Sequence, residues 1–86
     1  MSITTEQLDT AVKVLGEAAS VRAAAAALRE QMAPLHVTVL DAFDMRRETP
    51  AARVADRALY LMSTDGHCWS VTVEPAQASA FVLTQA

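Results

Sequence analysis

The hydrophobic pattern of this 86-residue chain changes once, at Pro34, and that change constrains the fold more than any motif does. Before Pro34 the apolar residues recur with helical spacing, and directly after it residues 35–40 are rich in β-branched side chains. The chain therefore has a helical part followed by a part made of strands. It is typical of an α+β domain in which helices pack on one face of an antiparallel sheet.

The first part of the chain predicts two helices. Thr4 and Gln7 form a capping-box pattern, and Gly16 is a natural helix end because glycine readily adopts a left-handed conformation. Residues 20–32 predict the second helix, and we expect residues 1–34 to form a helical hairpin. The apolar stripe of the second helix consists of Val21, Ala24, Ala25, Leu28 and Met32.

The second part predicts a small antiparallel sheet of three to four strands, which with the helices makes a single domain. Residues 35–40 are rich in β-branched side chains, and residues 57–74 resemble a β-hairpin. Between them, residues 41–56 are expected to form a long surface loop. Residues 81–83 are a fourth strand or a docked extended segment.

The register of the hairpin decides which side chains face the core. A two-residue Asp65-Gly66 turn pairs Met62 with Trp69, whereas a three-residue loop pairs Leu61 with Trp69. We favour the three-residue loop because it gathers large apolar residues on one face. The inward set is then Leu59, Leu61, Trp69, Val71 and Val73. The outward set is Tyr60, Met62, Cys68, Ser70 and Thr72.

Charge and composition exclude several classes of partner. Seven basic residues against ten acidic ones give a net charge of −3, which opposes nucleic-acid binding. Cys68 is the only cysteine, so no internal disulfide forms, and the polar N-terminus lacks the features of a signal peptide. No apolar stretch is long enough to span a membrane. We therefore expect a cytoplasmic protein without a membrane or nucleic-acid partner.

The shortage of large side chains suggests that the chain binds another protein. Aromatic residues make up 5% of the sequence, so the core of so short a domain is small. A partner surface, including that of a second copy in a homodimer, would complete the burial.

A mixed-charge segment between the predicted strands is the candidate contact. It is either a solvated loop or a docking loop for an acidic partner surface, in which Phe43 and Met45 serve as apolar anchors. Arg53 and Arg57 extend the same basic group. The candidate interaction loop consists of Asp41, Phe43, Asp44, Met45, Arg46 and Arg47.

The alternative is a small metal- or cofactor-handling protein that uses His36, His67 and Cys68. Zinc and copper sites need several such groups at one point, yet adjacent strand residues point to opposite faces. The distance between His36 and His67 decides whether one ion bridges both. A nucleophilic Cys68 would need a base and an oxyanion site, and paired Asp41 and Asp44 carboxylates would need a pocket. We therefore expect no enzymatic activity and no cofactor.

Several short segments resemble one known family. They are Ala27-Leu28-Arg29, Leu35-His36-Val37-Thr38, the acidic stretch 41–44, Leu59-Tyr60-Leu61 and Gly66-His67-Cys68. In this order they are similar to a family of short uncharacterised bacterial proteins encoded near nitrogen-fixation genes. Consecutive Asp residues are expected in the acidic stretch, which here is interrupted by Ala42 and Phe43. The resemblance implies an accessory role around nitrogenase or its maturation, without a mechanism.

Two hypotheses from different classes follow. The first is a non-enzymatic interaction domain, and the second is the metal- or cofactor-handling protein. A third, a regulatory domain that senses a small ligand on the outward sheet face, also fits the pattern.

Overall fold

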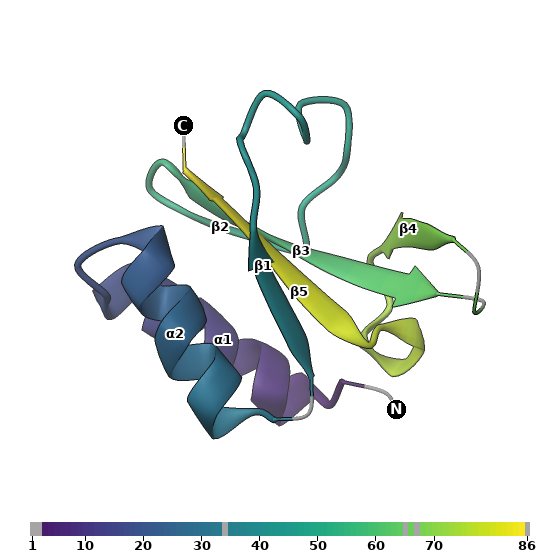
Figure 1. The fold of residues 1–86 in the computed structure, drawn as a ribbon, viewed down its shortest axis with the longest axis horizontal. Helices are drawn as coiled ribbons and strands as arrows, with labels where there is room; N and C mark the ends of the chain where they lie inside the picture. The colour runs from purple at the N-terminus through teal and green to yellow at the C-terminus, as the bar shows by residue number, and fades with distance from the viewer. Residues whose placement is uncertain (1–2, 34, 65, 67, 86) are drawn as a thin grey trace.

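Two helices cover one face of a five-stranded sheet in the computed structural model, which describes residues 3–33, 35–64, 66 and 68–85 (Figure 1). The α+β class with two N-terminal helices is confirmed. The sheet has more strands than the three or four expected, and it is mixed because one strand pair is parallel. The elements are α1 (Thr5–Glu17), α2 (Val21–Gln31), β1 (His36–Val39), β2 (Ala52–Val54), β3 (Arg57–Thr64), β4 (Trp69–Thr72), the 3₁₀ turn η1 (Pro75–Gln77) and β5 (Ala80–Gln85).

The start of each helix follows the local sequence. The Gln7 amide donates to the Thr4 hydroxyl at 3.0 Å, and the Thr4 amide donates to the Gln7 side chain at 2.9 Å, so the capping box is confirmed. Ser20 caps α2 by accepting a hydrogen bond from the Ala23 amide at 3.1 Å. Local side-chain chemistry therefore sets both helix starts.

The prediction that Gly16 ends the first helix is wrong. Helix α1 continues through Gly16 to Glu17, and Ala18 is the C-cap. The glycine has a packing role instead, because a Cβ atom at this position would lie 2.9 Å from Cγ1 of Val54. The absence of a side chain thus lets α1 approach β2 closely.

The last strand of the chain lies inside the sheet. The strand order is β1-β5-β3-β2, and β4 pairs with the far half of β3 on the same side as β2. Strand β5 is parallel to β1 and antiparallel to β3. Residues 81–83 therefore form a strand, and the segment 41–56 is not loop throughout, because β2 lies within it.

Both registers considered for the hairpin are wrong. In the structure Leu61 pairs with Thr72, and Thr64 pairs with Trp69. Because paired residues share a face, Trp69 lies on the face of Met62, opposite to that of Leu61. Trp69 is 50% exposed, and Val71 and Val73 also lie outside the core below the helices. The inward positions of Leu59 and Leu61 are confirmed, since both are fully buried.

Each face of the sheet carries its own apolar cluster. The helices lie on one face of the sheet (Figure 1). The larger cluster lies between the sheet and the helices, and the smaller one lies on the opposite face. Tyr60, which was expected to face outward, is 3% exposed because the loop before β2 covers it. The smaller cluster consists of Met45, Ala58, Tyr60 and Val82, with Met62 and Val71 packed against it.

Arg57 ties the helical layer to the sheet. Its Nη1 atom donates to the carbonyls of Leu15 and Ala18, each at 2.7 Å, and its Nη2 atom donates to the Ala19 carbonyl at 3.1 Å. The last carbonyls of a helix have no partner within the helix, and a cation is favourable beside them. Arg57 is thus a structural residue and does not belong to an exposed basic patch.

We predict that Arg57→Ala lowers the free energy of unfolding by about 2 kcal/mol, the scale of a hydrogen-bonded charged group. Arg53→Ala is the matched control, because Arg53 is an exposed arginine on the neighbouring strand β2 and should change stability by less than about 0.5 kcal/mol. Urea unfolding followed by circular dichroism measures both. Equal losses in the two variants would contradict the structural role of Arg57.

Candidate functional site

The face of the sheet without helices contains an apolar groove of about 430 Å³. This volume lies in the range of sites that hold a small molecule or a large side chain. Of the groove residues, only His36 was a sequence candidate for a site. The lining residues are His36, Thr38, Leu40, Met62, Trp69, Ala80, Phe81 and Val82.

A small residue in the middle of the sheet creates the hollow. His36 pairs with Ala80 and Ala80 pairs with Met62, so these three residues form one row across β1, β5 and β3. The methyl group of Ala80 fills little space between two larger neighbours. The row continues to Val71 on β4. The hollow therefore lies over Ala80, between His36 and Met62.

Two aromatic rings close one end of the groove. The rings of His36 and Trp69 meet edge to face, with centroids 6.1 Å apart and planes at 84°. Their strands, β1 and β4, are separated by β5 and β3, a span of about 14 Å at the usual strand spacing. The two side chains therefore bridge the sheet above Ala80. Trp69 gains this contact and still keeps half of its surface exposed.

The loop between β1 and β2 lies over the same face of the sheet, where Met45 packs against Tyr60 and Val82. It rises from the sheet (Figure 1), and successive backbone hydrogen bonds three residues apart shape it from Asp41 to Glu48. Asp41 also accepts a hydrogen bond from the Phe43 amide at 2.7 Å, which starts the first turn. These short-range bonds give the loop a defined shape without a regular element.

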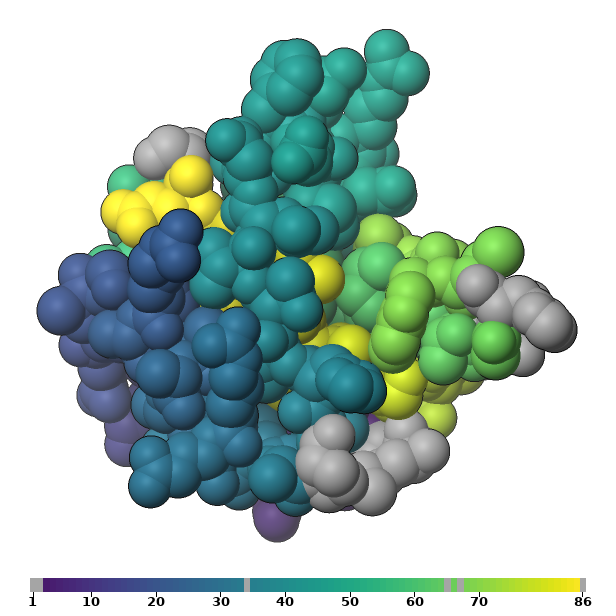
Figure 2. Space-filling view, in the orientation of Figure 1, coloured from purple at the N-terminus to yellow at the C-terminus, as the bar shows by residue number. Residues whose placement is uncertain are grey.

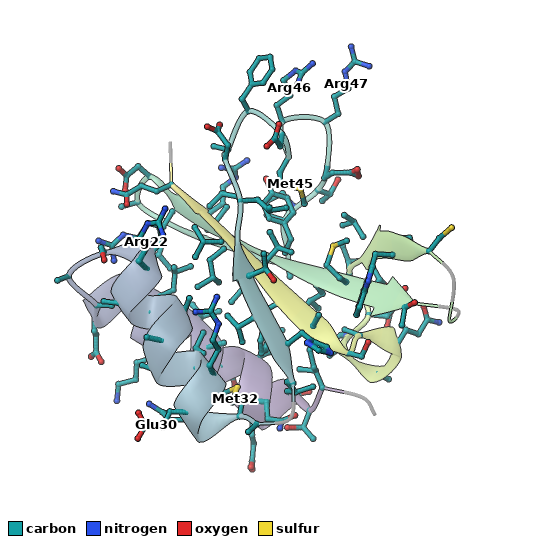
Figure 3. The ribbon with its side chains drawn as sticks, viewed as in Figure 1. Arg22, Glu30, Met32, Met45, Arg46 and Arg47 are labelled. Carbon is teal, nitrogen blue, oxygen red and sulfur yellow. The ribbon has the colours of Figure 1, made fainter. Side chains whose placement is uncertain are left out.

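Met45 attaches this loop to the sheet. Its side chain is 6% exposed and packs in the smaller apolar cluster, and the Tyr60 hydroxyl donates to the Met45 carbonyl at 3.3 Å. Figure 3 shows Met45 directed toward the sheet, whereas Arg46 and Arg47 point away from it. The expectation that Met45 is an exposed anchor is therefore corrected. Its role is to hold the loop in place.

Phe43 is the exposed apolar residue of the predicted interaction loop. It is 66% exposed, and the Arg46 guanidinium lies 3.9 Å from the centre of its ring. Arg46 also donates to the Phe43 carbonyl at 2.8 Å. The cation–π contact and the hydrogen bond together orient a ring that water surrounds on most of its surface. The other predicted loop residues, Asp41, Asp44 and Arg47, are exposed.

The groove lies between the loop that follows β1 and strand β4. In Figure 2 the loop (teal) and β4 (green) stand on either side of a hollow, and parts of β5 (yellow) are visible between them. The residues that the sequence interpretation did not assign to a site include Thr38, Leu40, Ala80 and Val82. Residues 36, 38 and 40 do share one face by strand alternation, which was the available signal.

The structure describes two of the three residues of the metal hypothesis, His36 and Cys68. His36 lies in the groove, and Cys68 is exposed directly before β4. His67 lies outside the described residues. The distance from His36 to His67, on which the metal hypothesis depends, is therefore not tested. Among the residues that the structure describes, no three His, Cys, Asp or Glu side chains gather as a metal site. The three-residue metal site therefore remains a prediction.

Comparison with known proteins assigns the chain to a family. Residues 10–86 match a family of unknown function, DUF6129. The chain belongs to this family. The DUF6129 range contains all five described strands and the whole groove, and it leaves out residues 1–9, which include the Thr4 cap and the start of α1. No curated protein and no solved structure matches the chain. In the described part of the chain, neither helix is long and apolar enough to cross a membrane.

The two apolar residues of the loop should respond differently to truncation. Met45→Ala should lower the free energy of unfolding by about 2 kcal/mol or more, because it opens a cavity in a buried cluster. Phe43→Ala should change stability by less than about 0.5 kcal/mol, since the ring is exposed. Chemical denaturation measures both values. Similar costs for the two variants would contradict the inward placement of Met45.

Proposed function

We propose that this protein is a non-enzymatic interaction domain that binds a partner protein on the open face of its sheet. The observation that carries the proposal is the apolar groove beside exposed large side chains. Leu40 and Trp69 line the groove and are 39% and 50% exposed, and Phe43, on the loop that follows Leu40, is 66% exposed. Aromatic side chains of this kind are enriched at the centres of protein interfaces.

The chemistry of the groove favours binding over catalysis. Its lining is mostly apolar, and His36 and Thr38 are the polar side chains among the lining residues. An acid–base or nucleophilic mechanism needs at least two reactive groups within hydrogen-bond distance of one reacting atom. The groove instead offers apolar surface, which gains free energy when a partner excludes water from it.

The resemblance described from the sequence directs the choice of partner. Proteins similar to this chain in five short segments are encoded near nitrogen-fixation genes. We therefore propose that the partner belongs to nitrogenase or to its maturation machinery, and that the protein acts in the cytoplasm as an accessory. The exposed Arg46 and Arg47 beside the groove would suit an acidic patch on that partner.

The proposal is tested by capture with matched variants. The tagged protein is exposed to extract of a nitrogen-fixing host grown with and without fixed nitrogen, and bound proteins are identified by mass spectrometry. A nitrogenase subunit or assembly factor should bind the wild type. Trp69→Ala should reduce its recovery about tenfold or more, as expected for an aromatic at the centre of an interface.

Arg22→Ala is the control, because Arg22 is exposed on α2 in the helical layer (Figure 3). It should bind the same partner as the wild type. Equal recovery with Trp69→Ala would contradict binding at the groove. Absence of every nitrogenase-related protein from the wild-type capture would contradict the proposed partner.

A further inference from the structure

We infer that a second copy of this chain binds the open face, forming a twofold dimer in which Phe43 of each copy enters the groove of the other. The inference rests on the proposed function, because it names an occupant for the same surface. It follows from three properties of that surface: a projecting ring beside a matching hollow, charges of both signs, and the amount of apolar area exposed.

The projecting ring and the hollow belong to the same side of the molecule. Phe43 lies three residues after Leu40, which lines the groove, and the turns around Asp41 and the Arg46 contact keep its ring away from the sheet. A benzene ring occupies a cavity of about 150 Å³, so a groove of about 430 Å³ has room for a phenyl group. In a twofold dimer the same patch is used twice, so each ring meets a groove.

The charges on the loop suit contact with an identical loop. Arg46 and Arg47 lie between the acidic residues Asp41 and Asp44 on one side and Glu48 on the other, and all five side chains are exposed. Three acidic and two basic residues give a net charge of 2 − 3 = −1, so two such loops repel only weakly. In a twofold dimer the two loops run antiparallel to each other across the axis. The acidic residues of one copy can then face the arginines of the other.

The exposed area is of the size that a dimer needs. A standard interface buries about 800 Å² per partner, which is about 15% of the 5164 Å² surface of this chain. At about 200–250 Å² per aromatic side chain, Phe43 and Trp69 together expose about 250 Å². Two residues therefore supply about a third of the required area. Leu40 and the charged side chains of the loop add further exposed area beside these two residues.

Association should be visible through Trp69, which is the only tryptophan of the chain. Its indole lines the groove, so the entering phenyl ring would displace water from it. Sedimentation should show the mass rising from 9.2 kDa toward twice that value between about 1 µM and 1 mM protein. The tryptophan emission should shift to shorter wavelength over the same concentration range.

Two variants test the arrangement of the dimer. Phe43→Ala removes the ring and Trp69→Ala damages the groove, so each should weaken association about tenfold or more. Their equimolar mixture should associate more tightly than either variant alone, because an intact Phe43 then meets an intact groove once per dimer. Val73→Ala is the control, since Val73 is 56% exposed but does not line the groove, and it should associate like the wild type.

The results separate this inference from the proposed function. A wild-type mass of 9.2 kDa at every concentration overturns the dimer, as does wild-type association by Phe43→Ala. Capture of a nitrogenase-related protein by such a monomer would still support the proposed function. Conversely, a dimer with the expected variant pattern supports the inference even where no nitrogenase-related protein binds. A partner protein that uses the groove should also compete with the second copy and lower the dimer fraction.

Discussion

The insertion of β5 between β1 and β3 holds the two halves of the sheet together and positions both apolar clusters. This strand closes the sheet by pairing in parallel with β1 and antiparallel with β3, and five of its six residues are buried. Phe81 and Leu83 complete the core below the helices, whereas Ala80 and Val82 form the floor of the groove. Because alternate residues face opposite sides of a strand, one segment supplies both the core and the candidate site.

The open groove is a consequence of the size of the chain. A domain of 86 residues has material for two layers, so one sheet face is covered by helices and the other only in part. Met45 and Tyr60 cover one region of that second face, and the ring pair of His36 and Trp69 covers another. The apolar surface between them is where the binding energy of a partner would come from.

Three arginines that look equivalent in the sequence have different structural roles. Arg57 binds the carbonyls at the end of α1, and Arg29 donates from Nε to the Val37 carbonyl at 2.9 Å, which joins α2 to β1. Arg46 instead holds the exposed ring of Phe43. The basic residues between positions 46 and 57 therefore do not form one patch: Arg57 is structural, whereas Arg46 contacts Phe43 on the surface. A guanidinium group donates to nearby carbonyls and stacks on aromatic rings, so the surroundings of each arginine set its role.

The fold class, the capped helix starts, the existence of the hairpin and the burial of Leu59 and Leu61 are predictable from the amino-acid sequence. Each depends on residues within a few positions of one another, through helical spacing, capping or strand alternation. The register that exposes Trp69, the place of β5, the inward turn of Met45 and the packing role of Gly16 are visible only in the folded chain. These features depend on contacts between distant segments, and a shift of register by an odd number of residues moves every side chain to the other face.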